Sequence, residues 1–139
     1  IKCVAAPEDI PAGTADIIVS NHALEHVLNP HGELSNLREA LKPGGRLAIC
    51  IPMDRSKRAF DGTYDINHHL YGWTPLLLAN LVGEAGFEVA EAKVLRHAWP
   101  PRAHIFARLP RPVFDLLSRM RSLLTGRCQV TLLAIRPSD

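Results

Sequence analysis

Two histidines and a glutamate lie close together in the sequence, in a pattern that suits acid–base or metal chemistry. His22, Glu25 and His26 follow the β-branched run Ile17 to Val19, which predicts a short strand buried on both faces. An imidazole titrates near neutral pH, and a carboxylate beside it can orient the ring. Because open α/β sheets bind ligands outside the carboxyl ends of their strands, we expect these side chains at such an edge.

A second pair of histidines lies in the long aperiodic stretch from Met53 to Trp73. Loops of this length in compact domains usually serve a function, for example as a lid, or are disordered. One interpretation is that His68 or His69 accepts a proton from a hydroxyl group, with Tyr71 and Trp73 forming one wall of the site. The competing interpretation is that the aromatic rings pack at the edge of the core and that the histidines are solvated.

The segment from His22 to His26 also spells H-x-x-E-H, which is a zinc-protease motif when it lies on a long helix. A β-run ends at Ser20 and Asn29-Pro30 follows soon after, so the sequence does not favour such a helix. Zinc hydrolysis is therefore kept as an alternative. A further alternative is that Glu25 and His26 only hydrogen-bond the backbone of the turn.

The elements that would position these residues lie between Asp16 and Pro52. Asn29-Pro30 supplies an N-cap and a first-turn proline, and residues 43–45, Pro-Gly-Gly, end the predicted helix. Residues 47–51 predict a second buried strand, which completes a right-handed strand–helix–strand unit. The apolar stripe of the helix consists of Leu34, Leu37, Ala40 and Leu41.

The second half of the chain repeats these signals. Thr74-Pro75 opens another helix, Gly86 ends it, and Phe87 to Leu95 predicts a strand. The buried stripe expected for this helix consists of Leu77, Leu78, Leu81, Val82 and Ala85.

The order of these pieces resembles a known family. The runs D-I-I-V-S, L-E-H-V and L-K-P-G-G-R-L are similar to the middle of class I S-adenosylmethionine-dependent methyltransferases, in the small-molecule branch. The resemblance continues through residues 74–89 and 129–137, and covers most of the chain outside 96–128. It implies an α/β fold: one domain over residues 1–139 with a Rossmann-like, mostly parallel sheet, an antiparallel last strand and flanking helices.

The same resemblance implies S-adenosylmethionine as cofactor and methyl transfer to an oxygen, nitrogen or carbon of a small-molecule acceptor. It places the backbone of Asn21, His22 and Ala23 along the methionine part of the cofactor. Asp9 and Ile10 fall in the loop that contacts the adenine, although the family's usual polar position there is occupied by alanine and proline in this chain.

His26, Glu25 and His69 are the candidate catalytic residues. Some related O-methyltransferases place acidic and histidine ligands near this loop, so the resemblance also allows His22, Glu25 and His26 to hold a divalent ion beside an acceptor hydroxyl. No metal is needed for the main prediction.

The glycine-rich turn that the family uses for the cofactor is not found in this sequence. Gly44-Gly45 follows a helix and precedes a strand, which is typical of a helix cap. We therefore expect a domain truncated at its N terminus. The sheet edge left open would be covered by unusual pairing of Ile1 to Ala6, or by a homodimer through that edge.

Composition bounds the remaining possibilities. The chain has 139 residues and a formal net charge of +2, which predicts one domain and no nucleic-acid partner. The 3 cysteines are far apart, which favours a reducing cytoplasm, and no apolar run is long enough to span a membrane. A non-catalytic interaction or structural domain derived from such an enzyme is the alternative from another functional class.

Residues 96–128 are the stretch that the family does not predict. Six arginines and one acid, Asp115, lie between Arg102 and Arg127. Residues 112–124 predict an amphipathic helix, and we interpret the stretch as a basic helical insertion that packs on the sheet. A surface for an acidic acceptor or lipid headgroups, and a dimerisation element, are the other two interpretations.

Overall fold

The computed structural model describes residues 9–53, 60, 62–64 and 67–138. Within these residues a single sheet has the strand order β1-β2-β4-β3. β2 is parallel to β1, whereas β4 is antiparallel to both β2 and β3, so β4 alone is reversed. The α/β prediction with a mostly parallel sheet and an antiparallel last strand is confirmed. The strands are β1 Ala15–Asn21, β2 Leu41–Pro52, β3 Glu88–Leu95 and β4 Gln129–Ile135.

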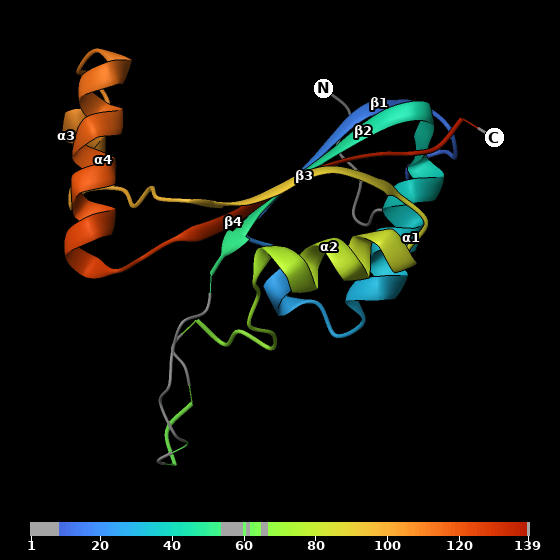
Figure 1. The fold of residues 1–139 in the computed structure, drawn as a ribbon, viewed down its shortest axis with the longest axis horizontal. Coiled ribbons are helices and arrows are strands. Elements are labelled where there is room, and N and C mark those ends of the chain that lie inside the picture. The colour runs from blue at the N-terminus through green and yellow to red at the C-terminus, as the bar shows by residue number, and fades with distance from the viewer. Residues whose placement is uncertain (1–8, 54–59, 61, 65–66, 139) are drawn as a thin grey trace.

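The two helices that follow β1 and β2 begin where the sequence predicts. α1, Pro30–Ala40, is capped by the Asn29 side chain, which accepts a hydrogen bond from the Gly32 N–H at 3.0 Å. α2, Pro75–Glu84, is capped by the Thr74 hydroxyl oxygen, which accepts from the Leu77 N–H at 3.3 Å. Both helices lie on the same face of the sheet (Figure 1).

The core lies between this face and the two helices. Leu47, Ile49 and Ile51 of β2 point into it and are buried, as the strand prediction requires. The α1 stripe is buried as expected, whereas only part of the α2 stripe is, since Leu77 is 53% exposed. The largest fully buried apolar side chains are Leu34, Leu41, Leu47, Ile51, Leu78, Val82, Val130 and Leu132.

The prediction that the first strand is buried on both faces is wrong. Ile17 is 62% exposed and Val19 is 70% exposed, while Ile18 between them is half-buried against the core. α1 and α2 cover one face only, and among the described residues β1 pairs with β2 alone. Ile1 to Ala6, which we expected to cover this edge, lie outside the described residues. The alternative, a homodimer through this edge, stays a prediction.

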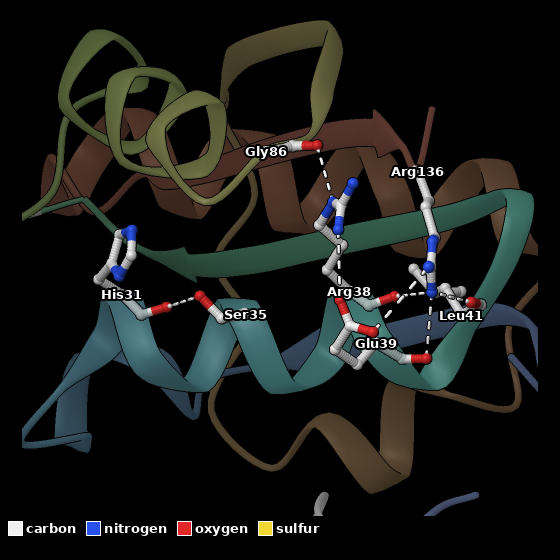
Figure 2. Close-up of polar contacts among 7 residues, drawn as sticks. All are labelled: His31, Ser35, Arg38, Glu39, Leu41, Gly86 and Arg136. Atoms are coloured by element: carbon white, nitrogen blue, oxygen red, sulfur yellow. Dashed lines mark hydrogen bonds and ion pairs between the residues drawn. The ribbon is translucent and has the colours of Figure 1, made fainter. Parts of the chain in front are cut away.

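The end of the last strand is tied to the helix that precedes β2 (Figure 2). Nη1 of Arg136 lies 2.8, 3.1 and 2.7 Å from the carbonyl oxygens of Arg38, Glu39 and Leu41. These carbonyls belong to the last turn of α1 and its C-cap, where helical partners run out. Nε of Arg38 in turn donates to the Gly86 carbonyl at 3.0 Å, which joins α1 to the turn after α2.

Residues between β3 and β4 form two helices that stand apart from the sheet and from α1 and α2 (Figure 1). They are α3, Ala103–Phe106, and α4, Arg111–Thr125. The predicted amphipathic helix is therefore present, but the prediction that it packs on the sheet is wrong. Leu116, Met120 and Leu123 are 58%, 51% and 64% exposed, because nothing in the described part of the chain covers them.

Candidate functional site

The turn after β1 carries the polar residues singled out in the sequence. β1 ends at Asn21, and a short 3-10 helix, η2, spans Leu24–His26. The His22 N–H donates to the Cys50 carbonyl at 2.8 Å, and His22 has a positive φ of 52°. An unusual left-handed residue at this point turns the chain sharply away from the sheet edge. The turn therefore lies at the carboxyl ends of β1 and β2.

Glu25 is the buried centre of this turn, with 0% of its surface exposed. Its Oε1 atom lies 3.5 Å from His22 Nδ1 and 3.8 Å from His26 Nε2. Neither carboxylate oxygen accepts a hydrogen bond from any described residue. A buried carboxylate without hydrogen bonds is costly, so this position is suited to a ligand that brings N–H groups or positive charge.

His69 joins this cluster from the downstream loop. Its ring centroid lies 5.1 Å from that of His26. The Leu70 N–H donates to the Glu25 carbonyl at 2.9 Å, which fixes the loop beside the turn. One ligand atom each from Glu25, His26 and His69 lie within 4.8 Å of one another, a spacing that a metal ion could bridge.

The zinc-protease geometry is not formed. The H-x-x-E-H segment lies after the end of β1, in a turn with only three helical residues, and α1 begins only at Pro30. A protease of that class needs both histidines on one face of a longer helix.

A cavity of about 310 Å³ opens next to His69. Tyr71 lines it, and the Tyr71 hydroxyl donates to the Leu28 carbonyl at 3.0 Å. Trp73 lies behind Tyr71, with ring centroids 5.7 Å apart, and is 5% exposed. Tyr71 lines this cavity and Trp73 packs in the core, and a role for Tyr71 as the wall of an acceptor site stays a prediction. The lining residues are Pro52, Met53, His69, Leu70, Tyr71 and Gly72.

Two polar residues of this site were missed in the sequence. Gln129 Nε2 lies 3.1 Å from His22 Nε2, and the Cys50 thiol donates to Gln129 Oε1 at 3.2 Å. Burial raises the pKa of the Cys50 thiol, and the negative charge of Glu25 raises that pKa further. The missing signal was the strand order, since only β4 lying beside β2 brings Gln129 to this edge.

Residues 4–92 match a family model described as a methyltransferase domain. This span is more than half of the chain, and the strand order agrees with it. The chain belongs to the class I S-adenosylmethionine-dependent methyltransferases. Membership in this family favours neither the zinc hydrolase nor the non-catalytic alternative.

Relatives and solved structures agree with this assignment. The methyltransferase chain is 32% identical over 120 residues to an uncharacterized methyltransferase of Mycobacterium bovis, an alignment covering 86% of the chain and 51% of the relative. It is 30% identical over 93 residues to the ubiquinone biosynthesis O-methyltransferase of Cereibacter sphaeroides, covering 56% of the chain and 36% of that protein.

A solved structure with the same fold is 1,6-didemethyltoxoflavin-N1-methyltransferase of Burkholderia thailandensis, with bound 1,6-didemethyltoxoflavin and S-adenosylhomocysteine. The TM-score is 0.56 at 18% identity, covering 91% of the chain and 45% of that structure. The chain spans about half the length of the Mycobacterium relative, at 51%.

The predicted cofactor residues of this methyltransferase domain lie in two places. Asn21, His22 and Ala23 are at the carboxyl end of β1, beside Glu25. Asp9 and Ile10 precede β1 and line a second cavity, of about 360 Å³, with Asn36, Glu39 and Ala40 of α1. The structure therefore does not bring Asp9 and Ile10 to the histidine cluster, and a role for them in cofactor binding stays a prediction.

Proposed function

We propose that the complete protein transfers a methyl group from S-adenosylmethionine to a hydroxyl oxygen of a small-molecule acceptor held in the cavity beside His69. The observation that carries this proposal is the position of His69, which lines the cavity on one side and contacts the His26 ring on the other. A base at the wall of an acceptor cavity is what transfer to a hydroxyl requires.

The residues present fit the cofactor. The carboxyl ends of β1 and β2 form the edge where such sheets bind ligands, and the buried Glu25 carboxylate there has no hydrogen-bond donor among the described residues. The ammonium group or the sulfonium of S-adenosylmethionine would supply the positive charge that this carboxylate lacks. The bound cofactor supplies an activated methyl group, which ends on the acceptor oxygen and leaves S-adenosylhomocysteine.

The chain's own residues then have separate tasks. His69 takes the proton that the acceptor hydroxyl loses, and His26 holds the His69 ring by direct contact. Glu25 lies 3.8 Å from His26 Nε2 and helps to orient the His26 ring. Tyr71 and Met53 shape the cavity and limit access of water to it.

The name of the Cereibacter relative supports an oxygen acceptor, and the Burkholderia structure supports S-adenosylmethionine as methyl donor. In both comparisons this chain covers less than half of the other protein. We therefore propose the activity for the complete protein and not for these 139 residues alone.

The test combines calorimetry with S-adenosylhomocysteine and transfer of a labelled methyl group to a panel of phenols, carboxylic acids and amines. We expect tight S-adenosylhomocysteine binding and label on phenolic oxygens. The variant His69→Gln should bind S-adenosylhomocysteine as the wild type does and lose about a hundredfold or more in kcat, the usual range for a general base.

His104→Gln is the matched control, because His104 is an exposed histidine on α3. Absence of S-adenosylhomocysteine binding in the complete protein would refute the methyltransferase activity. Label appearing on amines but not on hydroxyls would refute the acceptor class and leave the methyl donor intact.

A further inference from the structure

The exposed face of α4 is apolar along its whole length. Val113, Leu116, Met120, Leu123 and Leu124 project from it, and their exposed fractions run from 43% for Val113 to 86% for Leu124. These residues recur at spacings of three and four, so they form one continuous stripe on the helix. A contiguous exposed apolar stripe of this size marks a surface that binds something.

The opposite face of α4 is the one that attaches the helix to the rest of the chain. Ser118 and Ser122 on that face are 0% and 1% exposed. The Ala98 N–H donates to the Ser118 carbonyl at 3.1 Å, and His97 Nε2 lies 3.7 Å from Asp115 Oδ1. The helix thus packs through small and polar side chains and turns its apolar side to solvent, the reverse of a core helix.

Arginines border the apolar stripe on both sides. Arg119 is three residues after Leu116 and four before Leu123, so it flanks one edge. Arg121 is four residues after Leu117 and three before Leu124, and flanks the other edge. Arg102, Arg108, Arg111 and Arg127 add further charge, whereas the single acid, Asp115, already contacts Arg111 at 3.8 Å and His97.

We propose that α4 binds the surface of a membrane that contains anionic lipids, with its apolar stripe at the boundary of headgroups and acyl chains. An apolar stripe bordered by arginines is complementary to such a surface, because the side chains can reach lipid phosphates while the leucines leave water. No described helix is long and apolar enough to cross a bilayer, so α4 would lie along the surface.

A second copy of the chain fits this face less well than a lipid surface does. Packing two α4 stripes together would bring the arginine borders of both helices side by side, with Asp115 as the only acid of the segment. Anionic headgroups neutralise the same borders. Trp99, which is 69% exposed in the segment that leads into α3, would add an interfacial anchor.

The segment that contains α4 is attached to the sheet at the end that carries the candidate site. Residues 96–128 leave the sheet after Leu95 of β3 and return at Gln129 of β4, and Gln129 contacts His22. A membrane bound by α4 would therefore lie at the end of the sheet that carries the His22–Glu25–His26 turn (Figure 1).

Vesicle flotation of the complete protein tests the proposal, with phosphatidylcholine alone and phosphatidylcholine mixed with phosphatidylglycerol. We expect binding to the mixed vesicles that weakens as salt rises. The double variant Leu123→Gln with Leu124→Gln, and separately Arg119→Gln with Arg121→Gln, should each weaken binding about tenfold or more, since stripe and borders both contribute.

Leu76→Gln is the apolar control, because Leu76 is 69% exposed on α2, and Arg46→Gln is the charge control on the exposed side of β2. All four affected leucines and arginines of α4 lie outside the core, and circular dichroism would show each variant folded as the wild type. Equal binding to both vesicle types, or no binding to either, would overturn the proposal. A dimer that the leucine variants dissociate, without vesicle binding, would assign the face to a second copy instead.

Discussion

Gln129 Nε2 lies 3.1 Å from His22 Nε2, so the first residue of β4 contacts the turn that follows β1. The geometry is consistent with one tautomer of His22. The Gln129 amide donates to Nε2, which leaves the Nδ1 proton to face Glu25 at 3.5 Å. The Cys50 thiol completes the chain by donating to Gln129 Oε1. A residue of the last strand thus orients a residue of the first turn.

Replacing this amide should cost stability. The variant Gln129→Leu removes the donor to His22 and the acceptor for Cys50, and we expect a loss of about 1 kcal/mol in the free energy of unfolding, as for a typical hydrogen bond. Urea denaturation measures it. Thr131→Val on the same strand is the matched control, because the Thr131 hydroxyl is buried without a hydrogen-bond partner among the described residues. Thr131→Val should be neutral or stabilising, and equal losses in the two variants would contradict the role given to Gln129.

Glu25→Gln should raise the stability of the fold and weaken ligand binding. The carboxylate is buried and accepts no hydrogen bond from described residues, so removing its charge at alkaline pH, where an imidazole is neutral, should raise the unfolding free energy by about 1 kcal/mol. The same change should weaken binding of S-adenosylhomocysteine about tenfold, because a charge-assisted contact is lost. Glu88→Gln, at an exposed carboxylate of β3, is the control and should change neither quantity. A destabilised Glu25→Gln variant would show that His22 and His26 already stabilise the charge.

Local signals in the sequence predicted the elements of this fold, because the groups that create them are neighbours in the chain. Asn29 and Thr74 cap the helices that they were expected to cap. The exposure of Ile17 and Val19 was not predictable, since a β-branched run shows that a strand forms but not which face another layer covers. The packing of α4 was mispredicted for the same reason. Its apolar stripe has the period of a core helix, and periodicity does not identify what the stripe contacts.

For the candidate site too, the sequence predicted the residues that are neighbours in the chain but not the contacts between distant segments. His22, Glu25 and His26 could be placed at a strand end because they directly follow β1 in the chain. Contact of His69 with His26 was not derivable, since it depends on the hydrogen bond from Leu70 to the Glu25 carbonyl across a loop. Gln129 was missed for a similar reason. Its contact depends on the antiparallel register of β4 with β2, which no short-range pattern specifies.

Arg136→Leu should destabilise the fold from the opposite end of the sheet. The guanidinium reaches the three carbonyls that end α1 and is 18% exposed, so its loss leaves those acceptors with few partners. We expect a loss of about 2 kcal/mol in the unfolding free energy, within the range for hydrogen bonds to a charged group. Arg46→Leu, at an exposed arginine of β2, is the matched control. Equal denaturation midpoints for the two variants would contradict a capping role for Arg136.

The Cys50 thiol should make stability depend on alkaline pH. Its pKa in the folded chain is raised from the usual 9.0, by burial first and by the Glu25 charge second. Well below pH 9.0 the thiol is neutral in both the folded and the unfolded chain, and its full contribution to stability is present. As the pH rises through the window above 9.0, the unfolded chain loses its proton first, so the stability advantage of the wild type over Cys50→Ala should shrink. Urea denaturation of both proteins across this window measures the difference.

In a chain where Cys3 and Cys128 are serine, Glu25→Gln should also speed alkylation of Cys50 at a fixed pH, because removing the carboxylate charge lowers the thiol pKa. An unchanged alkylation rate would show that the Glu25 charge does not reach the thiol.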